Sequence, residues 1–144
     1  MKRSFRATLI DAINNHAEDY PNMVVLNADS ARALKLTEFS AEYPDRMFGV
    51  GISEADLVST AAGMATTGLI PIVVGFSMFV SEKPFEQIRQ AIAYPNLNVK
   101  IVATHAGLCV GQDGATHQAL EDIAVMRTLP NFKVFVASDV TETK

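Results

Sequence analysis

The sequence predicts an α/β fold, a doubly wound parallel sheet with helices on both faces. Short apolar runs alternate with helical segments along the whole chain, which is the pattern of such sheets. The 144 residues are close to the usual size of one domain. Hydrophobic residues make up 49% and charged residues 19%, which excludes a disordered or fibrous chain. We therefore expect one domain with one core.

Five helical segments are predicted. In the first, apolar side chains recur every four positions from Phe5 to Ala17. The second has Thr37 as its N-cap, and the third stops at Gly68. The fourth carries Pro84 in its first turn. In order, the predicted helices cover residues 5 to about 20, 37–43, 53–67, 84–93 and 119–128.

Five strands are predicted between these helices. Each is a short apolar run with little polar alternation, which is typical of a strand buried on both faces of a parallel sheet. The runs are Met23–Leu26, Met47–Val50, Ile70–Phe76, Val99–Ala103 and Lys133–Val136. We expect all five to pair in one parallel sheet.

Charge and cysteine content exclude several classes of protein. The net charge is −4 and no run of Lys and Arg exists, which argues against nucleic-acid binding. The uncharged stretch between Asp56 and Glu82 has the length of a membrane span, but glycines and Pro71 divide it into a buried helix, a turn and a buried strand. The basic N-terminus lacks the apolar run of a signal peptide. The single cysteine, Cys109, fits a reducing compartment, so we expect a cytoplasmic protein without a membrane segment.

Polar and aromatic residues follow the predicted strands at their carboxyl ends. Ligands of open parallel sheets bind beyond these ends, because the connecting loops gather there. The candidate residues are Asp29 after the first strand, Glu54 after the second, Phe76 and Phe79 after the third, and His105, Asp113 and His117 after the fourth. The sequence therefore predicts one functional edge of the sheet.

Each candidate has a structural alternative. The segment Ser53–Asp56 has the form of a capping box, so Glu54 is either a helix-start acid or a carboxyl group that exchanges a proton with a ligand. Phe76 and Phe79 either fill the core or form a platform for a heteroaromatic ring. Cys109 is either reactive or simply small and apolar.

The polar residues of the long loop also leave alternatives open. His105, Asp113 and His117 either satisfy loop backbone groups or bind substrate. Their spacing matches no standard metal site, and no glycine-rich phosphate motif is present, so no metal ligand is predicted.

At these residues the chain resembles the pyrimidine-binding domain of transketolases. The similarity lies in Gly51–Val58 with Ala61–Ala65, in Thr104–Gly107 with Gly111–Asp122, and in Arg127 with Leu129–Asn131. It covers nearly the whole chain and is strongest to the C-terminal section of split, two-chain transketolases. Departures include Glu82, where transketolases often carry an aromatic residue, and Ala115, where they often carry proline.

The resemblance implies an enzyme that uses thiamine diphosphate to transfer a two-carbon ketol unit between sugar phosphates, as in the pentose phosphate pathway. Glu54 then hydrogen-bonds the pyrimidine ring nitrogen of the cofactor, and Phe79, with Phe76 beside it, stacks on that ring. Asp29 lies near the cofactor. The family's substrate residues match His105, Asp113 and His117, with the two histidines assigned catalytic roles.

The resemblance also implies that residues 1–144 are one domain of a larger assembly. The family's diphosphate-binding and C-terminal domains are absent. The last residues resemble the start of a further helix, so we expect an excised domain or a truncated chain. Mg²⁺ and the diphosphate would be bound by a separate chain, so we expect this chain alone to be inactive and to form a homo-oligomer, most simply a homodimer. The alternatives are a component similar to deoxyxylulose-phosphate synthase or to two-oxoacid dehydrogenases, or a catalytically silent dimerising module.

Overall fold

The computed structural model describes residues 4–108 and 110–144. Its strands form a four-stranded parallel sheet in the order β2-β1-β3-β4. The α-helices and strands are α1 (Phe5–Asn15), β1 (Met23–Asn27), α2 (Thr37–Glu42), β2 (Met47–Gly49), α3 (Glu54–Thr66), β3 (Ile70–Phe76), α4 (Phe85–Gln87), β4 (Lys100–Thr104) and α5 (Asp122–Arg127). The other helical segments are the 3-10 turns η1 (Pro44–Arg46) and η4 (Ala115–His117) and the π-helical segments η2 (Met78–Glu82) and η3 (Ile88–Ala93). The predicted α/β class is confirmed.

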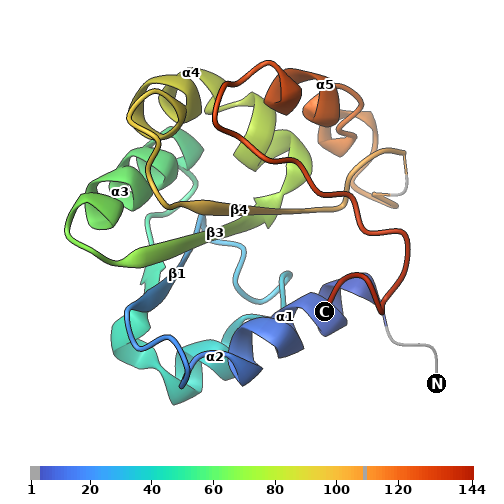
Figure 1. The fold of residues 1–144 in the computed structure, drawn as a ribbon. Helices are drawn as coiled ribbons and strands as arrows, with labels where there is room; N and C mark the ends of the chain where they lie inside the picture. The colour runs from blue at the N-terminus through green and yellow to red at the C-terminus, as the bar shows by residue number, and fades with distance from the viewer. Residues whose placement is uncertain (1–3, 109) are drawn as a thin grey trace.

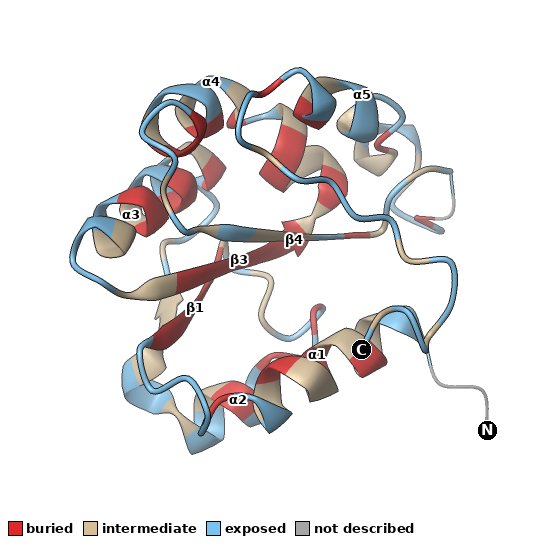
Figure 2. Cartoon of the chain, viewed as in Figure 1, coloured by how far each residue is buried: buried red, intermediate tan, exposed pale blue. Residues whose placement is uncertain are grey.

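Helices cover both faces of the sheet. Helices α1 and α2 lie on one face, and α3, α4 and α5 lie on the other (Figure 1). Strand β1 shows why the two faces can both be apolar: Met23 and Val25 pack in the cluster with α1 and α2, whereas Val24 and Leu26 pack in the cluster with α3. Side chains alternate across a strand, so a continuous apolar run supplies two cores. Buried residues accordingly line both sides of the central strands (Figure 2).

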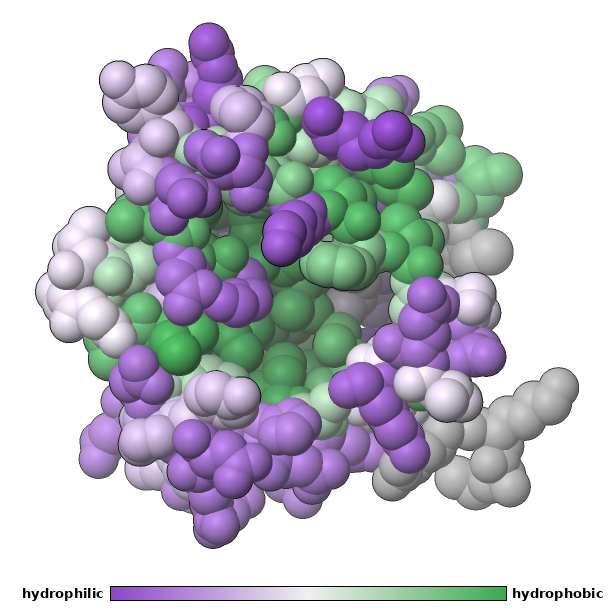
Figure 3. Space-filling model, in the orientation of Figure 1, coloured by the Kyte–Doolittle hydropathy of each residue, from purple (hydrophilic) through white to green (hydrophobic). Residues whose placement is uncertain are grey.

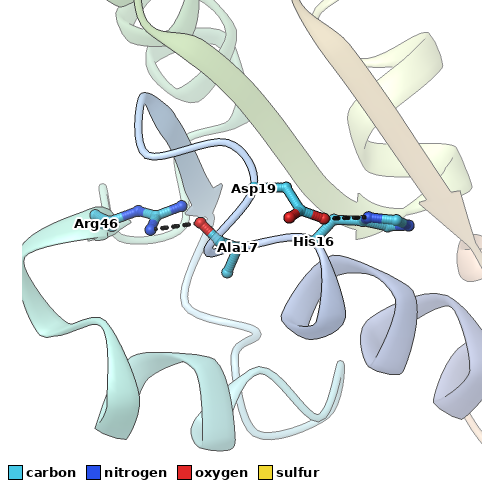
Figure 4. Close-up of polar contacts among 4 residues, drawn as sticks. All are labelled: His16, Ala17, Asp19 and Arg46. Carbon is cyan, nitrogen blue, oxygen red and sulfur yellow. Dashed lines mark hydrogen bonds and ion pairs between the residues drawn. The ribbon is translucent and has the colours of Figure 1, made fainter.

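Arg46 ties the start of the sheet together. Its guanidinium donates hydrogen bonds to three backbone carbonyls, those of Ala17 at 2.9 Å, Tyr20 at 3.0 Å and Met23 at 2.8 Å. Figure 4 shows the bond to Ala17 beside the contact between His16 and Asp19. Ala17 and Tyr20 lie in the turn that joins α1 to β1, and Met23 is the first residue of β1, so Arg46 fixes this turn and the strand start against the segment that enters β2.

Two predicted helix starts are wrong in detail. Leu36, not Thr37, occupies the N-cap position of α2, and no side chain caps this helix. Pro84 precedes α4 as its N-cap residue rather than lying within its first turn. The segment from Met78 to Ala93 alternates between π- and α-helical turns, which sequence periodicity at 3.6 residues does not predict.

The predicted fifth strand, Lys133–Val136, is also wrong. Within the residues that the structure describes, this segment is extended but pairs with no strand. Its side chains are exposed, Phe135 at 87% and Val136 at 64%. Strand propensity reflects the fit of a side chain to a pleated, half-buried surface, and here no such surface is provided.

No helix among the described residues is long and apolar enough to cross a bilayer. The uncharged stretch between Asp56 and Glu82 forms most of α3, a turn and all of β3, as expected, and continues into the π-helical segment η2.

Candidate functional site

The carboxyl ends of the parallel strands bring the candidate residues to one edge of the sheet. Asp29 follows β1, Glu54 follows β2, Phe76 ends β3, and His105 follows β4. Asp29 and His105 have positive φ angles of 56° and 55°, which turn the chain sharply where the strands end. The predicted common edge is therefore observed.

A cavity of about 640 Å³ opens at this edge. It brings together four of the predicted residues, Asp29, Phe76, His105 and Asp113. The rest of its wall comes from the N-terminal helix and the loop after β1, namely Arg6, Ser30, Arg32, Ala33 and Lys35. Three cationic side chains thus surround a histidine and two carboxylates.

His105 is held by hydrogen bonds at both ring nitrogens. Arg6 Nη1 lies 3.2 Å from Nε2, and Thr104 Oγ1 lies 2.8 Å from Nδ1. A guanidinium can only donate, so Nε2 accepts and Nδ1 carries the proton of the neutral ring. The Thr104 hydroxyl in turn donates to the carbonyl oxygen of Gly75 at 3.1 Å. This chain of bonds fixes the orientation and the tautomer of the imidazole.

The pKa of His105 is lowered from its ordinary value. Burial is the largest cause, and the positive charge of Arg6 adds to it, while the negative charge of Asp113 acts in the opposite direction. The lowered pKa therefore favours the neutral form of the ring in the folded chain.

Aromatic rings form a second group beside this cavity. The Phe76 ring lies 4.4 Å from the His105 ring and 6.4 Å from the Phe79 ring, measured between centroids. The Phe79 and His117 rings are 4.9 Å apart. All four rings are partly exposed rather than fully buried, so they can offer edges and faces to a ligand.

Glu54 begins α3 and does not line the cavity. Its side chain is only 6% exposed, and its Oε2 atom lies 2.5 Å from the ammonium of Lys83. Ser53 holds the N-cap position, yet its side chain makes no capping hydrogen bond. The capping-box alternative therefore lacks its main contact, and Glu54 is a buried carboxylate whose ion-pair partner, in the described part of the chain, is Lys83.

The remaining candidates are less constrained. Asp113 is exposed, and His117 Nδ1 lies 3.0 Å from the Thr116 hydroxyl. Cys109 lies outside the described residues. Residues 4–108 and 110–144 contain no group of three or more His, Cys, Asp or Glu side chains that could hold a metal ion.

Sequence reasoning missed the basic residues of the site. Arg6 lies on the amphipathic N-terminal helix, 99 residues from His105, so local patterns do not connect them. Arg32 and Lys35 lie in the polar loop after β1. Their positive charge could have marked them as site residues, because ligands of parallel sheets bind beyond the strand ends. Lys83 directly follows the π-helical segment η2, which sequence periodicity does not predict, so no local pattern connects it with Glu54.

Comparison with known proteins decides the family. Residues 1–144 match the family described as transketolase, pyrimidine binding domain. The chain belongs to this family. The pyrimidine-binding domain is 46% identical over 144 residues to a protein of Methanocaldococcus jannaschii that bears the provisional name transketolase C-terminal section. The matched region is all of this chain and 44% of the length of that relative.

Other relatives carry different names. A 1-deoxy-D-xylulose-5-phosphate synthase of Halalkalibacterium halodurans is 39% identical over 139 residues, which are 96% of this domain and 22% of the synthase. The 6-deoxy-6-sulfo-D-fructose transketolase subunit of a Clostridium species is 33% identical over 139 residues, 96% of this domain and 43% of the subunit. The domain thus spans less than half the length of these relatives.

Solved structures of transketolases share the fold of this domain. A split-gene transketolase, described as an inactive β4 tetramer, superposes with a TM-score of 0.86 at 43% identity, over 99% of this domain and 46% of that chain. The transketolase of Campylobacter jejuni superposes with a TM-score of 0.88 at 25% identity, over 97% of this domain and 22% of that chain. The doubly wound pyrimidine-domain fold is confirmed.

Proposed function

We propose that this domain binds the aminopyrimidine half of thiamine diphosphate and serves a transketolase reaction, the transfer of a two-carbon ketol unit between sugar phosphates. The observation that carries the proposal is the buried carboxylate of Glu54 at the start of α3, on the same sheet edge as the partly exposed rings of Phe76 and Phe79. Two similar proteins are named as transketolase components, which supports the proposal.

The residues present fit the pyrimidine half of this cofactor. A flat heterocycle with ring nitrogens needs an aromatic surface and a polar partner shielded from water, which Phe79 with Phe76 and Glu54 supply. When bound, thiamine diphosphate supplies the carbon nucleophile that carries the two-carbon unit. The role we assign to Glu54 is to hold a proton at the pyrimidine ring nitrogen.

The cavity walls support a phosphorylated sugar as substrate. Arg6, Arg32 and Lys35 provide positive charge for a phosphate, and the Arg6 Nε atom is buried without a hydrogen-bond partner in the part of the chain that is described. Neutral His105 and the carboxylates of Asp29 and Asp113 suit sugar hydroxyl groups. We assign His105, Asp113 and His117 to substrate binding, and His105 and His117 to proton transfer.

We further propose that a separate chain binds the diphosphate and Mg²⁺, because the domain is similar to a split-gene transketolase. Without that partner we expect a cytoplasmic, inactive homo-oligomer. Figure 3 shows apolar side chains gathered in a hollow in the middle of one face, with polar side chains along part of its border, and such a surface favours association.

The test compares Glu54→Gln with Ser53→Ala in the enzyme reconstituted with its diphosphate-binding chain. Glu54→Gln keeps the side-chain volume but holds no transferable proton, so turnover and hydrogen–deuterium exchange at the thiazolium carbon should fall by ~100-fold or more. Ser53→Ala should change neither, because its side chain makes no capping bond. Near-normal exchange in Glu54→Gln would make Glu54 a structural acid and overturn the proposal.

A deoxyxylulose-phosphate synthase-like component is the second candidate, favoured by the 39% identity to such a synthase. Turnover of pyruvate with glyceraldehyde phosphate, in place of ketose and aldose phosphates, would identify it. A two-oxoacid dehydrogenase-like component would use a two-oxoacid without a sugar acceptor. A silent dimerising module would show neither cofactor binding nor turnover with any of these substrates.

A further inference from the structure

The ion pair between Glu54 and Lys83 has no assigned purpose in the proposed reaction. Lys83 Nζ lies 2.5 Å from Glu54 Oε2 and neutralises a carboxylate that is otherwise shut off from water. The two partners differ greatly in exposure, since the Glu54 side chain is 6% exposed and that of Lys83 is 49% exposed. The lysine therefore reaches into solvent, whereas the carboxylate does not.

The position of Lys83 relates it to the aromatic surface. It directly follows the π-helical segment η2, which carries Phe79 four residues earlier. Phe79 therefore lies about one turn before Lys83 in the same helical segment, and the aromatic surface and the ion pair are neighbours along the chain. A ring stacked on Phe79 and hydrogen-bonded to Glu54 would approach the same carboxylate.

We propose that Lys83 is a positioning residue that occupies Glu54 until the cofactor displaces it. This inference rests on the proposed function. An ammonium group is a donor without acceptor capacity, so Glu54 acts as the acceptor in the observed pair. To hold a proton at a ring nitrogen, Glu54 must act as the donor. Lys83 and the ring nitrogen compete for the same carboxyl group, so in this proposal the lysine withdraws toward solvent when the ring binds.

The pair also explains how the chain tolerates a buried carboxylate without a ligand. Removing one partner of a buried ion pair leaves an uncompensated charge and destabilises the fold. A half-exposed lysine offers neutralisation in the free chain at a small cost when it leaves, because its ammonium returns to water. An ordinary structural ion pair would contribute to stability and have no effect on cofactor affinity.

The first experiment measures coupling in the chain alone by thermal unfolding of Lys83→Met, Glu54→Gln and the double variant. Lys83→Met should lower Tm by about 3–6 °C, the shift that corresponds to the loss of one such contact in a domain of this size. In the Glu54→Gln background the same change should have almost no effect. Lys133→Met, which removes an exposed lysine, is the matched control and should leave Tm unchanged. Additive effects of the two single changes would overturn the proposal.

The second experiment measures thiamine diphosphate affinity by calorimetry in the enzyme assembled with its diphosphate-binding chain. Lys83→Met should bind the cofactor about 10-fold more tightly than the unmodified chain, and Lys83→Arg, which keeps the charge, should stay close to it. The gain should vanish when Glu54→Gln is added. Equal or weaker binding by Lys83→Met would overturn the proposal and leave the proposed function standing. Absence of cofactor binding in every variant would overturn both.

Discussion

Arg6 and His105 meet across 99 residues of sequence, with Arg6 Nη1 3.2 Å from His105 Nε2. Arg6 also donates to the carbonyl oxygen of Ala33 at 2.9 Å, so one guanidinium connects α1, the loop after β1 and the end of β4. All three segments contribute to the wall of the cavity. Arg6 therefore contributes both to the lowered pKa of His105 and to the packing of these segments against one another.

The first prediction concerns the titration of His105. Burial and then Arg6 lower the pKa of His105, so Arg6→Met should raise it part of the way toward its ordinary value, because burial remains. Proton NMR of the imidazole ring across pH 4–8 measures this. Arg89→Met, at an exposed position on η3, is the control. An unchanged His105 pKa in Arg6→Met would show that the guanidinium does not act on the ring.

The second prediction follows from the sign of that shift. A histidine with a lowered pKa in the folded state binds fewer protons than in the unfolded state, so its contribution destabilises the fold as the pH falls below its ordinary value of 6.5. His105→Gln should make the free energy of unfolding less dependent on pH between about 5 and 7. Urea denaturation at several pH values tests this, and an unaltered slope would contradict it.

The third prediction concerns Gly75 in β3. A Cβ atom at this position would lie 2.2 Å from Val80 Cγ1, and a valine cannot rotate its branched side chain out of the way without cost. Gly75→Ala should therefore lower the free energy of unfolding by about 1–3 kcal/mol. Gly49→Ala on β2 is the matched control, since its nearest atom, Asn27 Nδ2, lies 4.0 Å away.

The Gly75 effect has an internal check. If the clash with Val80 is the cause, the double variant Gly75→Ala/Val80→Ala should lose less stability than the two single changes together. Chemical denaturation gives the free energy of unfolding of the unmodified chain, the two single variants and the double variant. Strict additivity would place the cause elsewhere.

The fourth prediction concerns Arg46. Replacement by methionine removes three hydrogen bonds to the carbonyls of Ala17, Tyr20 and Met23, and should destabilise the chain by about 2–3 kcal/mol. Arg46→Lys should restore little, because an ammonium lacks the planar fork that reaches all three acceptors. Calorimetric melting separates the variants. Full rescue by lysine would mean that charge rather than geometry is responsible.

The fifth prediction concerns the isolated chain. Because no metal-binding group is present among the described residues and the proposed diphosphate site lies in another chain, thiamine diphosphate should bind weakly and without Mg²⁺ dependence. Isothermal titration with and without Mg²⁺ tests this. Tight, Mg²⁺-dependent binding to this chain alone would refute the two-chain arrangement.

Local patterns in the sequence were sufficient to predict most of the helices and strands. The apolar run Met23–Leu26 predicted a strand buried on both faces, and it is one, because alternation of side chains across a strand is a local property. The positions of Asp29, Glu54 and His105 beyond strand ends followed from chain order alone, since parallel strands place all their carboxyl ends at one edge. The resemblance of Gly51–Asp56 and Gly111–Asp122 to transketolases identified the family, which the match over residues 1–144 confirms.

Tertiary structure decided what depends on contacts between distant segments. Lys133–Val136 has the composition of a strand, but a strand requires a neighbour with which to pair, and no residue pattern within the segment specifies one. The approach of Arg6 to His105, and of Lys83 to Glu54, likewise depends on how helices pack against the sheet. The sequence by itself determined four of the five predicted strands and the edge at which the functional residues gather, because both follow from local periodicity and chain direction. Only the folded structure determined which charges meet there, because long-range electrostatic contacts depend on distances that packing sets.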